Sequence, residues 1–196
     1  EYFNGVIGFF SGMPKHILLA MEIGVIFLPL FFHGIFGLLV TQRMKNTALT
    51  KGYGYFENRM YLVQRMTGLL LFILICLHVF TTTISAKYLG AGEESIQYAG
   101  MQAKLMAHGY LGLALYAIGV ALAAYHLCMG VWNFCIRWGI TISEGAMNKM
   151  RNICLGLFVA VTMLGWAALG GFLIHDVDPH TAVEASHGTV QVSMAR

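Results

Sequence analysis

Three histidines, His33, His78 and His126, lie inside long apolar runs of the sequence. Burying an imidazole in hydrocarbon costs free energy that packing alone does not require, so ionisable residues in such runs are functional candidates. Two imidazoles from different helices can bind a haem iron from opposite sides. We therefore expect metal-binding histidines here. The alternative for each one is a hydrogen bond to a neighbouring helix.

Four apolar runs could carry these histidines across a membrane. About 20 helical residues cross roughly 30 Å of hydrocarbon, and runs of this kind cover residues 17–40, 66–85, 105–136 and 153–174. The strict alternation of a transmembrane barrel is absent. The sequence predicts an all-α transmembrane helical bundle with four spans. We assign residues 1–175 to this bundle and residues 176–196 to a polar C-terminal tail.

The composition agrees with a membrane protein. Of the 196 residues, 58% are hydrophobic and 11% are charged, and the mean hydropathy is +0.68, outside the range of ordinary soluble domains. The net charge of +3 is small and forms no basic stripe, so nucleic acid is not an expected partner. The four cysteines have no iron–sulfur spacing and are expected to be buried apolar residues: Cys76, Cys128, Cys135 and Cys154.

The loops differ in charge, which predicts the orientation. One side holds most of the basic residues: Arg43, Lys45, Lys51, Arg59, Arg65, Arg137, Lys149 and Arg151. The other side holds fewer, mixed with acids: Lys15, Lys87, Lys104, Glu93, Glu94, Asp176, Asp178 and Glu184. By the positive-inside rule the first side faces the cytoplasm. We expect a multi-pass protein of the cytoplasmic membrane.

The depth of the histidines predicts which of them pair. His33 lies seven residues before the end of its run and His126 lies ten before the end of its own. Both are therefore roughly 10–15 Å from the cytoplasmic ends of helices that run in the same direction. We expect them to share one iron. His78 lies in the outer half of an oppositely directed span and needs a different partner.

Small residues follow each histidine by four positions: Gly37, Thr82 and Gly130, with Gly112 and Gly119 continuing the face of His126. Such residues would let a flat macrocycle approach the backbone. Their alternative role is close contact between membrane helices.

Three other residues have candidate roles near these sites. Pro29 should kink the first span and could aim His33. Arg137 could contact haem propionates, or it could be a snorkelling anchor at the membrane surface. Glu22, the one carboxylate within a predicted span, could exchange protons with a quinone.

Three segments resemble the di-haem cytochrome b membrane anchor of succinate:quinone oxidoreductases, the single-chain bacterial type of succinate dehydrogenase and fumarate reductase. They are EIGVIFLPLFFH, YGYFENRMYLVQRMTGLLLFILICLH and YHLCMGVWNFCIRWGIT, which contain His33, His78 and His126 in order. The resemblance implies that His33 and His126 bind the inner haem and His78 the outer one. Some members of this family carry a glutamate where Ala124 stands, so a proton route there is not expected.

The family fold has five helices, and the resemblance implies that the first of them is missing here. It carries the second ligand of the outer haem, and EYFNGVIGFFSGMPKH resembles the loop that follows it. Substitutes for that ligand within this sequence are His16, His108 and His175. One or two b haems are therefore expected.

The resemblance also implies a function. The chain would be the subunit that does not itself act on succinate, and it would pass electrons between an iron–sulfur subunit and a quinone, with menaquinone expected. A flavoprotein and an iron–sulfur subunit would bind its cytoplasmic face. The alternatives are a cytochrome b anchor of a hydrogenase or formate dehydrogenase, or a non-redox transporter with histidine proton relays.

Overall fold

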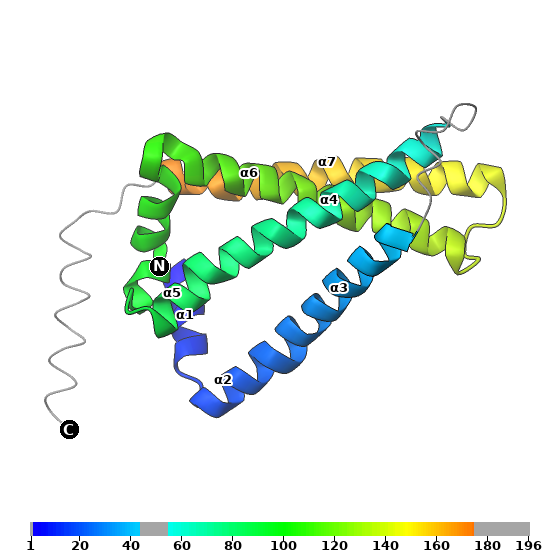
Figure 1. Ribbon diagram of the computed structural model, residues 1–196. Helices are drawn as coiled ribbons and strands as arrows, with labels where there is room; N and C mark the ends of the chain where they lie inside the picture. The colour runs from blue at the N-terminus through cyan, green and yellow to red at the C-terminus, as the bar shows by residue number, and fades with distance from the viewer. Residues whose placement is uncertain (1, 44–54, 175–196) are drawn as a thin grey trace, which may run out of the picture.

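The computed structural model describes residues 2–43 and 55–174, so the predicted C-terminal tail lies outside the described residues. Within those ranges every regular element is helical, and four helical stretches are long and apolar enough to cross a membrane. These are Lys15–Arg43, Phe56–Tyr88, Tyr98–Arg137 and Glu144–Ile174. The prediction of an all-α transmembrane bundle with four spans is confirmed (Figure 1).

The first span consists of α2 (Lys15–Met21), the π-helical η1 (Glu22–Phe27) and α3 (Leu28–Arg43). The π-helical stretch stands directly before Pro29, whose ring removes a backbone donor and disturbs the preceding turn. The Leu28 N–H accordingly bonds to Ile23, five residues back. The disturbance predicted at Pro29 is therefore a widened turn. The segment expected to be a loop before this span instead forms a short helix, α1 (Tyr2–Ser11).

The second span also changes its helical geometry part of the way along. It consists of α4 (Phe56–Val79), the π-helical η3 (Phe80–Ile84) and α5 (Ser85–Tyr88). The Thr81 and Thr82 hydroxyls donate to backbone oxygens one turn back, with Thr82 Oγ1 2.6 Å from the His78 oxygen. Such back-bonding competes with the regular helix pattern. The π-helical stretch therefore begins at Phe80, two residues after His78.

The third span is broken near its outer end. After the short 3-10 helix η4 (Glu93–Ile96), α6 (Tyr98–Arg137) contains non-helical backbone from Ala107 to Tyr110, and His108 and Gly109 have positive φ. The predicted span at 105–136 therefore begins two residues before a bend and includes it. Gly112 does not open a slot beside His126: a side chain there would collide with the Lys104 backbone, so this glycine permits the bend.

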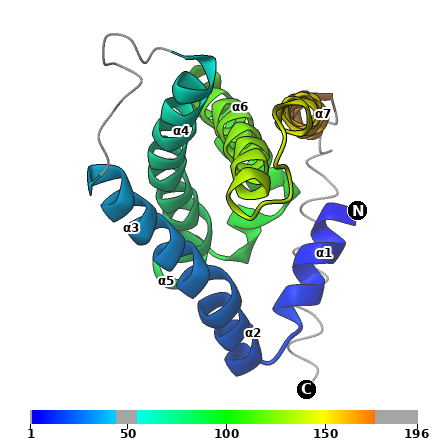
Figure 2. The same ribbon diagram turned by 90° about the vertical axis from the view of Figure 1, so that its right-hand side faces the viewer.

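Helices α6 and α7 (Glu144–Ile174) lie side by side along most of their lengths, and α4 crosses α6 (Figures 1 and 2). A buried cluster joins the three helices: Met60, Cys128, Met129, Trp132 and Cys154. Of the cysteines, three are buried as predicted, whereas Cys76 is exposed.

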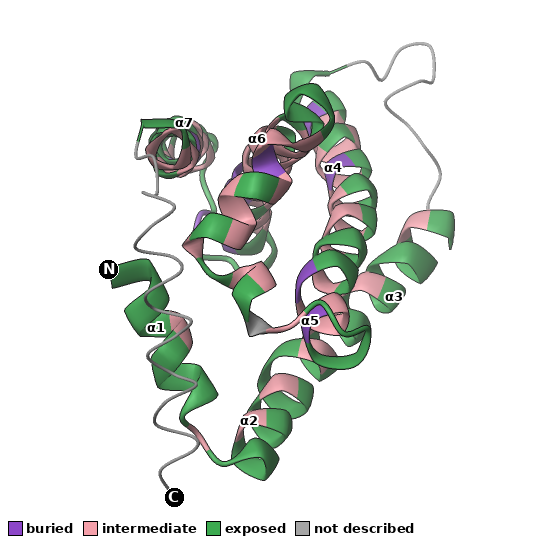
Figure 3. Ribbon diagram, turned by 90° about the vertical axis from the view of Figure 1, so that its left-hand side faces the viewer, coloured by how far each residue is buried: buried purple, intermediate pink, exposed green. Residues whose placement is uncertain are grey.

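The first span is packed far less closely than the other three. From Lys15 to Arg43 no residue is buried (Figure 3). It contacts α4 through an edge-to-face pair of Phe31 and Phe72, and a side chain at Gly34 would strike the Phe72 ring. The first span and α4 therefore approach each other closely at Gly34, over a small contact area.

The ends of the spans separate the charges as the sequence predicts. The end of α3, the start of α4, the end of α6 and the start of α7 lie at one end of the bundle (Figure 1), where Arg43, Arg137 and Arg151 are found. The opposite end holds Lys15, at the start of α2, and Lys87, in α5. We assign the first end to the cytoplasm by the positive-inside rule and call it the cytoplasmic end.

Candidate functional site

His33 of α3 and His126 of α6 face each other between two spans that run in the same direction. Their ring centroids are 6.1 Å apart and the ring planes are nearly perpendicular, at 81°. His33 is exposed and His126 is half-buried. The structure thus brings together the two histidines that their depth in the sequence paired.

Helix α4 holds the ring of His126 in place. The Nδ1 atom lies 3.0 Å from the backbone oxygen of Gln64. Because a carbonyl oxygen only accepts, Nδ1 carries the proton and Nε2 keeps its lone pair. Gly68, one turn further along α4, supplies the space: a Cβ there would lie 2.6 Å from Cε1 of the ring. His126 is therefore oriented by α4 through Nδ1.

Gln64 also connects the two helices through its side chain. Its Oε1 accepts a hydrogen bond from Nδ2 of Asn133, which stands two turns after His126 on α6. A Cβ at Gly130 would lie 3.4 Å from Nε2 of Gln64, which is ordinary van der Waals contact. We term Gln64, Gly68 and Asn133 the His126 socket. The sequence analysis missed the socket, although an amide at seven-residue spacing from a histidine is a recognisable signal.

The two imidazoles fit haem better than a bare metal ion. Within the described residues, no group of three or more His, Cys, Asp or Glu side chains could hold a metal. A porphyrin supplies four nitrogens and needs only two axial ligands. Two metal–nitrogen bonds of about 2.0 Å, in line with both rings, would separate their centroids by roughly 6 Å. The observed centroid separation of 6.1 Å is compatible with this spacing.

His78 lies nearer the outer end and has a different partner. Its Nδ1 is 2.8 Å from the hydroxyl of Tyr116 on α6, and the two rings meet edge to face at 5.6 Å. Of the proposed substitutes for a second ligand, His16 is exposed in α2 and His108 is exposed in the bend of α6. His175 lies outside the described residues.

Glu22 has a partner that the sequence did not indicate. Nζ of Lys87 forms an ion pair with Oε1 of Glu22 and joins the outer ends of the first two spans. The side chains are 19% exposed for Glu22 and 33% for Lys87. Lys104 lies at the same end and donates to the Thr81 backbone oxygen at 3.0 Å. Charged groups thus gather where both π-helical stretches are found.

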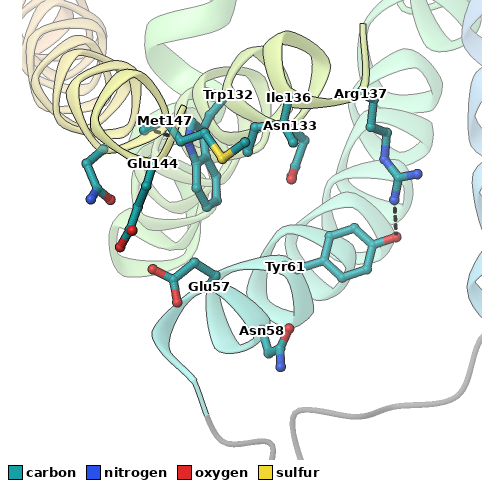
Figure 4. A pocket seen from close by; sticks show the side chains of 10 residues that line it. Glu57, Asn58, Tyr61, Trp132, Asn133, Ile136, Arg137, Glu144 and Met147 are labelled. Atoms are coloured by element: carbon teal, nitrogen blue, oxygen red, sulfur yellow. Dashed lines mark hydrogen bonds between the residues drawn. The ribbon is translucent and has the colours of Figure 1, made fainter. Parts of the chain in front are cut away.

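Arg137 lies at the cytoplasmic end, beside a cavity of about 600 Å³ between α4, α6 and α7 (Figure 4). Its Nη2 is 3.4 Å from the Tyr61 hydroxyl, and Arg65 stacks over the same ring at 4.0 Å. Glu57 also lines the cavity and pairs with Arg151 at 3.2 Å. Arg137 is therefore fixed at the surface of the bundle, a position compatible with both roles considered for it.

Comparison with known proteins agrees with these observations. A family profile described as the succinate dehydrogenase/fumarate reductase transmembrane subunit matches residues 40–165. The chain is also 32% identical, over 173 residues, to the succinate dehydrogenase cytochrome b558 subunit of Bacillus subtilis, covering 88% of this chain and 81% of that protein. No solved structure matches significantly. Together with its four membrane-length helices, these matches indicate a multi-pass protein of the bacterial inner membrane. The chain belongs to the family of succinate dehydrogenase and fumarate reductase transmembrane subunits.

Proposed function

We propose that this chain is the cytochrome b anchor of its complex and that His33 and His126 are the axial ligands of a b haem. In this role it passes electrons between an iron–sulfur subunit and a quinone. The observation that carries the proposal is the pair of facing imidazoles, 6.1 Å apart at one level of the bundle. Family membership favours this role over a hydrogenase or formate dehydrogenase anchor and over a transporter.

The residues around His126 would control how the cofactor is held. The Gln64 backbone oxygen accepts from Nδ1, which would leave Nε2 of His126 as the nitrogen that binds the iron. Gly68 leaves room for the ring against α4, and the Asn133 amide bonds to the side chain of Gln64. A b haem, when bound, would supply reversible one-electron redox chemistry at its iron. The protein's own contribution is ligation, orientation and an apolar surrounding.

The cytoplasmic end would receive the partner subunits. The name of the Bacillus subtilis relative refers to succinate dehydrogenase, and the family resemblance implies a flavoprotein and an iron–sulfur subunit. The cavity beside Arg137 opens at the end of the bundle nearer to His126 than to His78. Arg137, whose guanidinium lies beside the Tyr61 hydroxyl at this end, would pair with a haem propionate.

The outer end would serve the quinone. We assign His78 to a second haem site and the Glu22–Lys87 pair to proton exchange with the quinone headgroup, menaquinone by resemblance. A carboxylate can take up a proton when a neighbouring charge changes, and it releases that proton when the charge is restored. Transfer of one electron between the two ends would exchange roughly 2.3 kcal/mol per 100 mV of membrane potential.

Substitution of the paired histidines tests the proposal. In the purified complex, His33→Ala and His126→Ala are each expected to remove the same haem, because one remaining imidazole leaves the iron with one axial ligand. The control is Ile174→Ala, since Ile174 is 78% exposed at the end of α7 and belongs to neither histidine's helix. The measurements are haem per polypeptide and the reduced-minus-oxidised spectrum. Wild-type haem content in both variants would refute the assignment.

A further inference from the structure

The side chains of His78 and Tyr116 form a hydrogen bond between α4 and α6. The Tyr116 side chain is half-buried on α6 and its hydroxyl lies 2.8 Å from Nδ1 of His78 on α4. The rings are nearly perpendicular, at 81°. We propose that Tyr116 is a positioning residue that holds the proton of His78 on Nδ1 and so sets the redox potential of the outer site. This inference rests on the proposed role of His78 as a haem ligand.

The chemistry of the contact supports this role. A histidine that binds a metal through Nε2 keeps its proton on Nδ1, and that N–H needs an acceptor where water is scarce. A tyrosine hydroxyl accepts through its oxygen while its own proton points elsewhere. The bond raises the electron density on the imidazole, and a more basic ligand stabilises the oxidised iron. Loss of the acceptor should therefore raise the potential.

The backbone after His78 is irregular, and the ring of His78 is held by its contact with Tyr116. The next turn is the π-helical stretch Phe80–Ile84, and the His78 oxygen is engaged by the Thr82 hydroxyl. Lys104 binds the Thr81 oxygen from the bent part of α6. The ring of His126 packs against the backbone of α4 at Gly68. The ring of His78 instead contacts a side-chain hydroxyl, which a substitution can remove.

The two histidines thus have acceptors of different kinds. His126 faces a backbone carbonyl, which no substitution removes, whereas His78 faces a hydroxyl, which Tyr116→Phe deletes with little change of shape. This difference makes a selective test possible. A role in helix packing alone would affect the stability of the bundle and leave both potentials in place.

The test is a redox titration of the purified complex carrying Tyr116→Phe, with the oxidised haems also examined by electron paramagnetic resonance. The matched control is Tyr88→Phe, the same chemical change at a tyrosine that is 70% exposed near the outer end. We expect one haem to shift to a higher midpoint potential with altered g values. The other haem, and both haems of the control, should keep the wild-type values. Loss of the outer haem alone, with the other haem at its wild-type potential, would also support the proposal.

Three results would overturn it. They are unchanged potentials in Tyr116→Phe, equal changes at both haems, and a single wild-type haem that survives His78→Ala. The third result would leave the proposed haem at His33 and His126 intact. Loss of haem in His33→Ala and His126→Ala is a separate measurement, so failure of the inference is distinguishable from failure of the proposed function.

Discussion

Gly68→Ala is the sharpest probe of the His126 socket because the clash can be worked out atom by atom. The new Cβ would lie 2.6 Å from Cε1 and 3.0 Å from Nδ1 of the His126 ring. Carbon atoms in ordinary contact are about 3.5–4.0 Å apart. The ring must therefore retreat by roughly 1 Å. Since Nδ1 is 3.0 Å from the Gln64 oxygen at the start, this movement takes the hydrogen bond beyond its useful range.

The expected cost follows from the role of that bond. Loss of an outer-shell partner of a metal-binding histidine typically lowers metal affinity by about 10–100-fold, which corresponds to about 1.4–2.8 kcal/mol. The substitution should otherwise favour the helix, because alanine is about 1 kcal/mol better than glycine in a helix interior. A loss of haem affinity would therefore arise at the ring and not from a weaker α4.

The assay is transfer of haem from the purified complex to excess apomyoglobin, followed by its absorbance. We expect faster release in Gly68→Ala, together with a lower haem content at purification. Gly156→Ala, in α7, is the matched control, since nothing lies within 4 Å of a Cβ at that position. Release from Gly68→Ala at the rate of the control would refute the reasoning that α4 orients the ligand.

Two further perturbations address the remaining contacts. Asn133→Ala removes the donor to the Gln64 side chain but leaves the backbone acceptor of His126, so haem release should rise less than in Gly68→Ala; equal or greater release would contradict this order. Glu22→Gln and Lys87→Met each leave one charge unpaired within the membrane, so each should lower the melting temperature of the complex, while the double variant should recover part of the loss. Additive losses in that cycle would show that the two side chains are not coupled.

The sequence predicted best the elements whose length and helical form are required by the lipid bilayer. Apolar runs must be helical and about 20 residues long to cross a bilayer, so all four spans were predictable with their order and direction. The depth of His33 and His126 followed from counting residues along two such helices. Local periodicity and membrane thickness suffice for these features.

What sequence reasoning missed depends on contacts between residues far apart in the chain. Gln64 meets His126 and Asn133 across more than 60 positions, and Lys87 reaches Glu22 across 65. The bend of α6 was also missed, because His108 adopts positive φ without being glycine. A β-carbon disfavours that conformation, so of the local residues Gly109 and Gly112 are compatible with a bend, whereas His108 does not predict one.

The weak packing of the first span has a consequence for biogenesis. One of the two facing imidazoles belongs to a segment, Lys15–Arg43, in which no residue is buried, and the other belongs to α6, whose neighbourhood contains the buried cluster. A cofactor bound by both histidines would link the first span to α6. Its binding free energy would then stabilise the association of the two helices. Under this arrangement, cells short of haem would accumulate a chain whose leading segment is undocked and exposed to membrane proteases. The supply of the pigment would then govern how much of the respiratory complex matures.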